Sequence, residues 1–129
     1  MSEENVEMVR RGVQSVEFFW TLLDEYVVFD LRDRPILDLD GVYVGRDAVI
    51  KASRHYWGTW DEYSIEAEEL IDAGSSVVMT VRERARGKGS GVPFDIHWAQ
   101  VWTFGRGRII RWDLFPDRAA ALEAVGLSE

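Results

Sequence analysis

The sequence predicts an α+β fold in which helices pack on one face of a curved, mainly antiparallel sheet. Two segments of the first half carry apolar residues at helical spacing, and three glycine-punctuated strands fill most of the second half. A chain of 129 residues with no internal linker or repeat predicts one domain, residues 1–129. Since the helices cannot cover the whole of a long sheet, its other face meets water or a second copy of the chain.

The first half predicts two helices and two strands. An apolar stripe at spacings of three and four predicts a first helix that is continuous through the segment 15–26. The stripe is formed by Val6, Val9, Val13, Val16, Trp20 and Leu23. β-Branched and aromatic residues predict a strand over 26–33, which Pro35 follows, and a short strand over 39–45. A second helix is expected over 45–63, weakened at Gly58, with Tyr56 and Trp60 on its apolar face.

The second half predicts a meander of three strands and a terminal helix. The strands are expected over 76–86, 92–104 and 108–115, with turns at 87–91 and 105–107. Pro116 and Asp117 are typical of a helix start and predict a last helix over 116–127.

Composition excludes several classes of function. The formal net charge is −8, which disfavours nucleic-acid binding, and the basic cluster 81–91 is interpreted as a solvated hairpin tip. No apolar run approaches the roughly 18 residues of a membrane span, and the acidic N-terminus lacks a signal core. There are no cysteines, which fits a cytoplasmic protein. Two histidines, His55 and His97, make a poor metal site, so no metal is expected.

Asp113 raises the main chemical question, because it interrupts an apolar strand. If residues 106 and 107 form a two-residue turn, Gly105 pairs with Arg108 and Gln100 faces Asp113. One sheet face then carries Trp98, Gln100, Trp102, Phe104, Arg111, Asp113 and Phe115. The other face carries His97, Ala99, Val101, Thr103, Ile110, Trp112 and Leu114. A one-residue error would exchange these partners.

The two faces suggest different uses. Aromatic side chains with a few polar groups are typical of small-molecule pockets, which predicts a pocket beside Gln100 and Asp113. The nearly apolar opposite face is typical of core or of a subunit interface.

Four stretches of the chain resemble the SnoaL-like polyketide cyclases of the nuclear transport factor two-like superfamily, which also includes ketosteroid isomerases. They are "SEENVEMVRRGV", "GVYVGRDAVI", "EELIDAGSSVVMTVRERARGKGSGV" and "WAQVWTFGRGRIIRWDLFPDRAAALEAVGL". The resemblance implies a cystatin-like, cone-shaped α+β barrel with a deep pocket and a homodimer formed through the outer sheet face. It also implies that Asp113, which follows Trp112, is a general acid/base. The chain departs from the family because "SVEFFWTLLDEY" shows no break in the first helix and Gln100 offers an amide where the cyclases keep a histidine.

These observations leave several readings of the site open. Asp113 either moves a proton or forms an ion pair with Arg111 or with an arginine of the strand 82–86. Gln100 either polarises a ligand oxygen or hydrogen-bonds Asp113. The predicted ligand-binding residues, which could instead be core, are Trp98, Trp102, Tyr56, Trp60, Phe29 and Phe115.

The expected function is binding of a hydrophobic cyclic metabolite, with cyclisation, isomerisation or dehydration by cofactor-independent proton transfer. The alternatives are a non-catalytic binding module and a structural dimerisation domain without a cavity.

Overall fold

The computed structural model describes residues 2–36, 39 and 41–127. In this part of the chain, four helices pack on one sheet of six strands. The elements are α1 (Ser2–Gln14), α2 (Val16–Leu22), β1 (Leu23–Asp30), β2 (Val42–Val44), α3 (Arg46–Trp57), β3 (Trp60–Ala73), β4 (Ser76–Gly87), β5 (Pro93–Gly105), β6 (Arg108–Phe115) and α4 (Arg118–Ala124).

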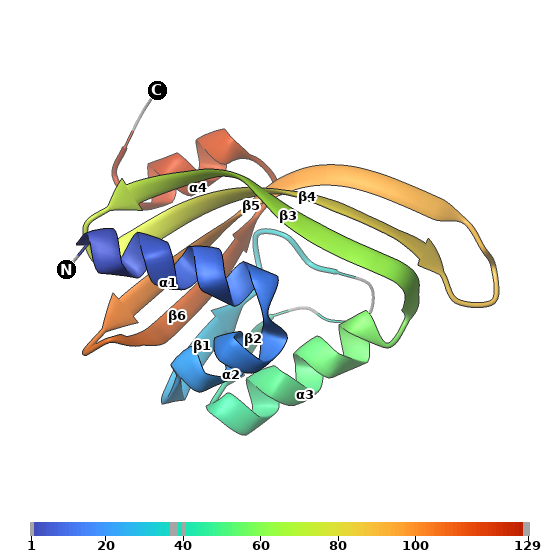
Figure 1. The fold of residues 1–129 in the computed structure, drawn as a ribbon, viewed down its shortest axis with the longest axis horizontal. Helices are drawn as coiled ribbons and strands as arrows, with labels where there is room; N and C mark the ends of the chain where they lie inside the picture. Colours follow the sequence, from blue (N-terminus) through green and yellow to red (C-terminus); the bar gives the residue numbers. More distant parts are fainter. Residues whose placement is uncertain (1, 37–38, 40, 128–129) are drawn as a thin grey trace.

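The helices lie on both sides of the curved sheet (Figure 1). The main core lies between the sheet and the helices α1, α2 and α3. Buried residues of α1, α2 and α3, such as Val9, Phe19 and Val49, form one cluster with the inward side chains of the strands. A second, smaller cluster joins α4 to the opposite face of β4, β5 and β6. The predicted α+β class is confirmed, but the prediction that the helices pack on one face is wrong, because α4 covers the opposite face.

The strand order is β2-β1-β6-β5-β4-β3. Strands β4 to β6 form the expected antiparallel meander, and β3, which was not predicted, pairs antiparallel with β4 at its edge. β1, however, runs parallel to β6, with Phe29 beside Trp112 and Asp30 beside Asp113. The chain folds its first strand onto its last one, a long-range pairing that local sequence patterns do not contain.

The prediction of one continuous first helix is wrong. The chain leaves the helical conformation at Ser15 (φ −144°, ψ 112°), whose hydroxyl accepts a hydrogen bond from the backbone N–H of Phe18 at 3.3 Å. Serine is a favoured N-cap because its oxygen satisfies a free N–H of the first turn. The break starts α2 in a new direction and brings Phe19 into the core.

The second predicted helix is too long at its C-terminal end. It ends at Trp57, where Gly58 caps it, and the chain continues as the edge strand β3 from Trp60. The sequence analysis assigned no strand to most of 60–73. The alternation of half-buried Tyr63, Ile65 and Ala67 with exposed neighbours is the signal that marks this strand.

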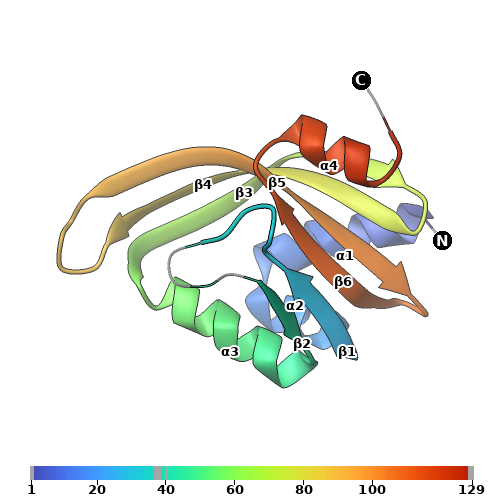
Figure 2. The same cartoon turned by 180° about the vertical axis from the view of Figure 1, so that it is seen from behind.

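The hairpin of β4 and β5 extends beyond α3, as Figure 1 and, from behind, Figure 2 show. Its tip contains Gly89 and Gly91, both at positive φ, which glycine adopts without strain. The tip is exposed, as the solvated-hairpin interpretation of 81–91 requires, but the base of the same segment enters the interior at Glu83.

Candidate functional site

The register of β5 and β6 decides which side chains face the helices. The turn is as predicted: Arg106 and Gly107 both have positive φ, and Gly105 pairs with Arg108. Directly after it, however, Phe104 pairs with Ile109 and Thr103 with Arg111, so Ile110 is an extra residue in β6. Such a β-bulge shifts the rest of the strand by one position.

The bulge overturns the predicted facing of Asp113. Gln100 pairs with Leu114, whereas Asp113 pairs with Val101 on the convex face. The predicted set is right for β5 and reversed for β6, so Trp112 and Leu114 join Gln100 on the concave face. The geometric reason for proposing Asp113 as the proton-transfer group of the pocket is therefore wrong.

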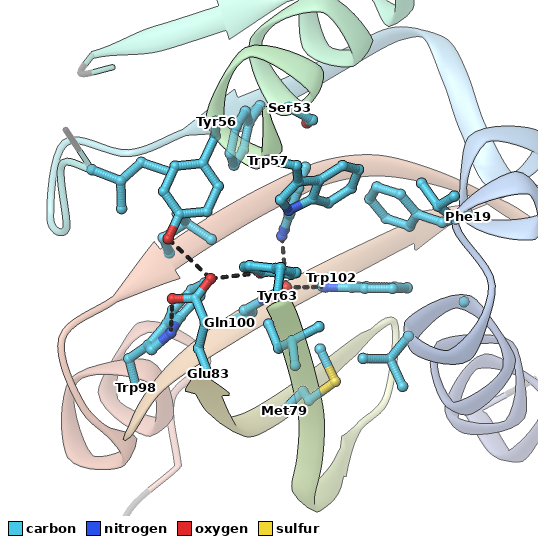
Figure 3. Close-up of a pocket in the computed structure, with 18 of the residues that line it drawn as sticks. Phe19, Ser53, Tyr56, Trp57, Tyr63, Met79, Glu83, Trp98, Gln100 and Trp102 are labelled. Carbon is cyan, nitrogen blue, oxygen red and sulfur yellow. Dashed lines mark hydrogen bonds between the residues drawn. The ribbon is translucent and has the colours of Figure 1, made fainter. Parts of the chain in front are cut away.

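A cavity of about 320 Å³ lies between the concave sheet face and the helices (Figure 3). Its walls are mainly aromatic and aliphatic. The aromatic residues that line it are Phe19, Phe29, Tyr56, Trp57, Tyr63, Trp98, Trp102 and Trp112. Pockets that bury a small ligand among apolar walls and a few placed polar groups are the common form of metabolite site.

Four of the six predicted ligand-binding residues line this cavity, namely Phe29, Tyr56, Trp98 and Trp102. The other two do not. Phe115 lies on the convex face, where it belongs to the cluster under α4. Trp60 lies outside the cavity lining, with its ring 4.6 Å from that of Phe94, because the chain is already in β3 at this residue.

Glu83 is the carboxylate of the cavity, and its residue is 0% exposed. One carboxylate oxygen, Oε2, accepts hydrogen bonds from the hydroxyls of Tyr56 at 3.0 Å and Tyr63 at 2.5 Å. The other oxygen, Oε1, accepts from the indole N–H of Trp98 at 3.2 Å. Figure 3 shows these three donors converging on the carboxylate from α3, β3 and β5.

Both phenols stay protonated around Glu83. Burial raises the pKa of Tyr56 and of Tyr63, and the neighbouring Glu83 charge raises each of them further. A phenol next to a carboxylate resists ionisation because two negative charges would then share an apolar site. The hydroxyls therefore remain hydrogen-bond donors to Glu83.

Arg34 covers the cluster from the segment after β1. Its guanidinium carbon lies 4.1 Å from the centre of the Trp98 ring, a cation–π contact. Burial lowers the pKa of Arg34, and the charge of Glu83 opposes that shift. The positive charge of Arg34 thus acts on the same carboxylate that the three donors contact.

Gln100 is the second polar group of the cavity and is 3% exposed. Its Oε1 accepts hydrogen bonds from the indole N–H groups of Trp102 at 2.7 Å and Trp112 at 2.8 Å. Since an indole N–H can only donate, these contacts fix which end of the amide is oxygen. No described residue accepts a hydrogen bond from the amide nitrogen in the structure, so its N–H groups are available to a ligand.

Glu83 is the functional candidate that the sequence analysis missed. It stood inside the basic segment 81–91, which was interpreted as solvated. Counting alternate residues from Val77 through Met79 and Val81 reaches Glu83, and this is the signal that places it on the inner face of β4.

On the convex face, Asp113 belongs to a charged cluster with Asp30, Arg32 and Arg111. The guanidinium of Arg111 donates to Asp113 at 3.0 Å and to Asp30 at 2.6 Å, and Arg32 donates to Asp30 at 2.8 Å. The predicted ion pair between Arg111 and Asp113 is therefore present. This cluster ties the parallel strands β1 and β6 together and lies on the sheet face opposite the cavity.

The pKa of Asp113 is raised, because burial opposes ionisation more than Arg111 favours it. A carboxyl whose folded-state pKa lies above its ordinary value of 3.8 holds its proton longer in the folded chain. Stability from this group is present below about pH 4 and is lost as the pH rises through the folded pKa. We expect the unfolding free energy of the wild type relative to Asp113→Asn to fall as the pH rises from the ordinary carboxyl pKa of 3.8 through the raised pKa of the folded chain.

Denaturant titrations at several pH values measure this slope. Asp95→Asn is the matched control, because hydrogen bonds from Arg82 lower the pKa of Asp95. The unfolding free energy of the wild type relative to Asp95→Asn should rise as the pH rises. Equal slopes for the two pairs would contradict the account.

The outer sheet face is not the apolar surface that the sequence analysis expected. Its apolar side chains, including Val78, Ala99 and Val101, are covered by α4. Much of the remaining face carries charged pairs, such as Arg82 with Asp95 and Arg84 with Glu66.

Two further features bear on the site. Within the described ranges, no group of three or more His, Cys, Asp or Glu side chains is placed to hold a metal ion. Among the same residues, no helix is long and apolar enough to cross a membrane.

A curved sheet closed by helices over one apolar cavity defines the class of small α+β pocket proteins. A family model described as the SnoaL-like domain matches residues 10–112, and the chain belongs to this family. No match was found among curated proteins.

Many solved structures share the fold, among them the following three. A nuclear transport factor two-like protein of unknown function from Burkholderia pseudomallei is 22% identical, with a TM-score of 0.74 over 95% of each chain. A protein of unknown function with a cystatin-like fold from Xanthomonas campestris is 13% identical, with a TM-score of 0.75 over 100% of each chain. TerC, co-crystallised with polyporic acid, is 17% identical, with a TM-score of 0.70 over 95% of this chain and 98% of its own. The family and fold that the sequence resemblance implied are thus confirmed.

Proposed function

We propose that this protein binds a hydrophobic cyclic small molecule in the cavity and transfers a proton on it, with Glu83 as the base. The observation that carries the proposal is a fully buried carboxylate in the wall of an otherwise largely apolar, aromatic cavity. A charge is rarely kept in such a place unless it is paired or has a chemical task.

The cavity walls favour a flat ligand. Trp112 stacks on Phe29 at 3.9 Å and meets Phe19 edge-on at 4.9 Å, so the inner wall is a set of rigid ring faces. Aromatic faces hold another ring by stacking as well as by burial. TerC, which shares the fold, was crystallised with polyporic acid, which supports an organic ring compound as ligand here.

Glu83 and Gln100 divide the chemistry between them. In the proposed step, Glu83 takes a proton from the ligand, so that a C–H or O–H bond breaks and the carboxyl O–H bond forms. The electron pair moves through the conjugated ligand to an oxygen, to which the amide N–H of Gln100 donates. The proton of Glu83 then returns to another atom of the ligand, which gives isomerisation or starts cyclisation or dehydration. Side chains of this chain supply both roles.

Glu83→Gln is expected to abolish proton transfer while ligand binding persists. The probe is 2-tetralone in D₂O, whose enolisable C–H positions exchange for deuterium and are followed by proton NMR. A positioned general base contributes about 10²- to 10⁴-fold, so the exchange rate above buffer should fall by about that factor.

Glu66→Gln is the matched control, because the side chain of Glu66 is 57% exposed on the neighbouring strand β3. It should exchange at the wild-type rate. A wild-type rate equal to that of buffer, or an undiminished rate in Glu83→Gln, would contradict the proton-transfer role.

The second candidate is a binding module without turnover. It is favoured by the hydrogen bonds that Glu83 accepts from α3, β3 and β5, because a residue that only holds these elements together would make the same contacts. Under this alternative, Glu83→Gln leaves no chemical deficit and Trp102→Ala removes ligand binding. A structural domain without a cavity is disfavoured by the 320 Å³ cavity.

Homodimerisation through the outer sheet face stays a prediction. The parts of this face that α4 leaves open carry exposed ion pairs, so a dimer formed there would have a more polar interface than most stable dimers have. Sedimentation equilibrium at micromolar concentration tests it: we expect twice the chain mass of 14.8 kDa, and a monomer would contradict the prediction.

A further inference from the structure

We propose that the free edge of β3 binds a basic, extended peptide segment of another protein, which adds to the sheet as a further strand. β3 is the last strand in the order of the sheet, so only β4 pairs with it among the described strands. An edge strand presents backbone N–H and C=O groups with which another chain can pair. The inference concerns the edge of the sheet rather than the cavity, so it goes beyond the proposed function and does not depend on it.

A groove of about 680 Å³ extends along residues 65–70 of β3, on the side where α1 packs (Figure 1). Its lining includes half-buried Ile65, which belongs to one face of the strand, and exposed Glu66, which belongs to the other. A surface that contacts both faces of a strand crosses an edge of that strand. Since β4 pairs along the opposite edge and contributes no residue to the lining, the groove lies on the free edge.

Residues 64–67 offer a regular stretch of backbone for pairing. Register shifts interrupt β3 between Asp61 and Ser64 and again between Ala67 and Glu69, but the residues between these shifts pair with β4 without interruption. Alternate peptide groups of a paired strand point away from its neighbour. In this stretch they point toward the groove, where an added strand would donate to them and accept from them.

The charge of β3 selects the partner. The strand contains six acidic residues and no basic one, and the acidic residues are Asp61, Glu62, Glu66, Glu68, Glu69 and Asp72. A second copy that paired its own β3 here would bring two such strands together, which like-charge repulsion opposes. A segment rich in lysine or arginine meets charges of the opposite sign instead. The edge therefore disfavours its own copy and favours a basic peptide.

The ion pairs within the protein leave these carboxylates open to a further cation. Arg84 on β4 lies 3.8 Å from Glu66, and His97 on β5 lies 2.8 Å from Glu68. The side chains of Glu66 and Glu68 nevertheless remain 57% and 40% exposed. Exposed pairs of this kind contribute little to stability. A lysine that approaches from the free edge therefore shares the carboxylate without breaking a strong contact.

The two sides of the groove specify the pattern of the peptide. On the side of the helix, the lining is apolar, with Val13 of α1 and Leu70 of β3. On the other side lie the carboxylates of Glu66 and Glu68. Because successive side chains of a strand point to opposite faces, the fitting sequence alternates small apolar residues with basic ones.

The probe is the fluorescein-labelled peptide Lys-Val-Lys-Thr-Lys-Val-Lys, whose binding is followed by fluorescence anisotropy. In one control peptide the three central amide nitrogens are methylated, which keeps the charge but prevents backbone pairing along either edge. In a second control, glutamate replaces each lysine. We expect each control to bind at least about 10-fold more weakly than the probe, because two or more hydrogen bonds or ion pairs are lost.

Charge reversal on the protein tests the location. Glu66→Lys combined with Glu68→Lys should weaken binding of the lysine peptide about 10-fold and should favour the glutamate peptide instead. The matched control is Glu25→Lys combined with Glu123→Lys, which changes the net charge equally at exposed positions on β1 and α4. This control should bind the lysine peptide nearly as tightly as the wild type does.

Hydrogen exchange followed by NMR identifies the edge that is bound. We expect the lysine peptide to slow exchange of the backbone amides of 64–67 and to leave those of β2, at the opposite edge of the sheet, unchanged. Failure of this peptide to bind the wild type, equal binding of the methylated peptide, or protection of β2 alone would overturn the proposal. Protection of 64–67 that rises with protein concentration in the absence of peptide would assign the edge to a second copy and would overturn it as well.

Discussion

Replacing Glu83 by leucine is expected to lower the free energy of unfolding by about 3 to 5 kcal/mol. The hydroxyls of Tyr56 and Tyr63 and the indole N–H of Trp98 all donate to this carboxylate. Leucine fills the space but accepts nothing, so three largely enclosed donors lose their partner. The charge of Arg34 loses its counterpart as well.

Urea denaturation followed by circular dichroism measures this loss. Glu66→Leu on β3 is the control. The carboxylate of Glu66 is exposed to solvent, and its 3.8 Å ion pair with Arg84 is of the exposed kind that contributes little to stability. The control should stay within about 1 kcal/mol of the wild type. If both leucine variants lose the same small amount, the Glu83 cluster does not stabilise the fold.

Replacing Trp112 by alanine is expected to lower the free energy of unfolding by about 3 to 5 kcal/mol and to remove ligand binding. Trp112 is 6% exposed, stacks on Phe29 and donates to Gln100. Its loss enlarges the cavity and removes an aromatic surface on which a ligand could stack. It also leaves Gln100 with a single indole donor. The amide then turns more freely, so affinity falls for two reasons.

Thermal unfolding and a titration with 2-tetralone, followed by tryptophan fluorescence, measure the two effects. Tyr26→Ala is the matched aromatic control, because Tyr26 on β1 is 74% exposed. Its stability and its affinity for 2-tetralone should stay near those of the wild type. Tight binding retained in Trp112→Ala would show that the ligand lies away from the sheet face.

Most of the fold was predictable because its signals are local. The strands β5 and β6 carry period-two patterns, and glycines mark the turns, including Gly107, which has a positive φ beside Arg106. The boundaries failed where a single residue overrides a pattern. Ser15 caps a new helix within an unbroken apolar stripe, and Gly58 ends α3 within an aromatic run.

The site was harder to predict than the fold, because its facing depends on geometry that the sequence does not mark. Gln100 and Trp102 were placed correctly from the alternation of β5 alone. Asp113 was misplaced because no residue type announces the bulge at Ile110. Glu83 was missed because its arginine neighbours give β4 the composition of a solvated segment, although alternation sends them outward.

The extra residue at Ile110 has a consequence for the evolution of this chain. If Ile110 paired regularly with Thr103 instead of bulging, Arg111 would pair with Trp102 and Asp113 with Gln100, and Trp112 and Leu114 would turn toward solvent. A deletion of three nucleotides at this codon would instead remove the bulge and leave Trp112 paired with Trp102, so it would keep the present inner and outer residues. The pairing of the C-terminal strand, as much as the identity of its residues, therefore determines which side chains it offers to a bound molecule.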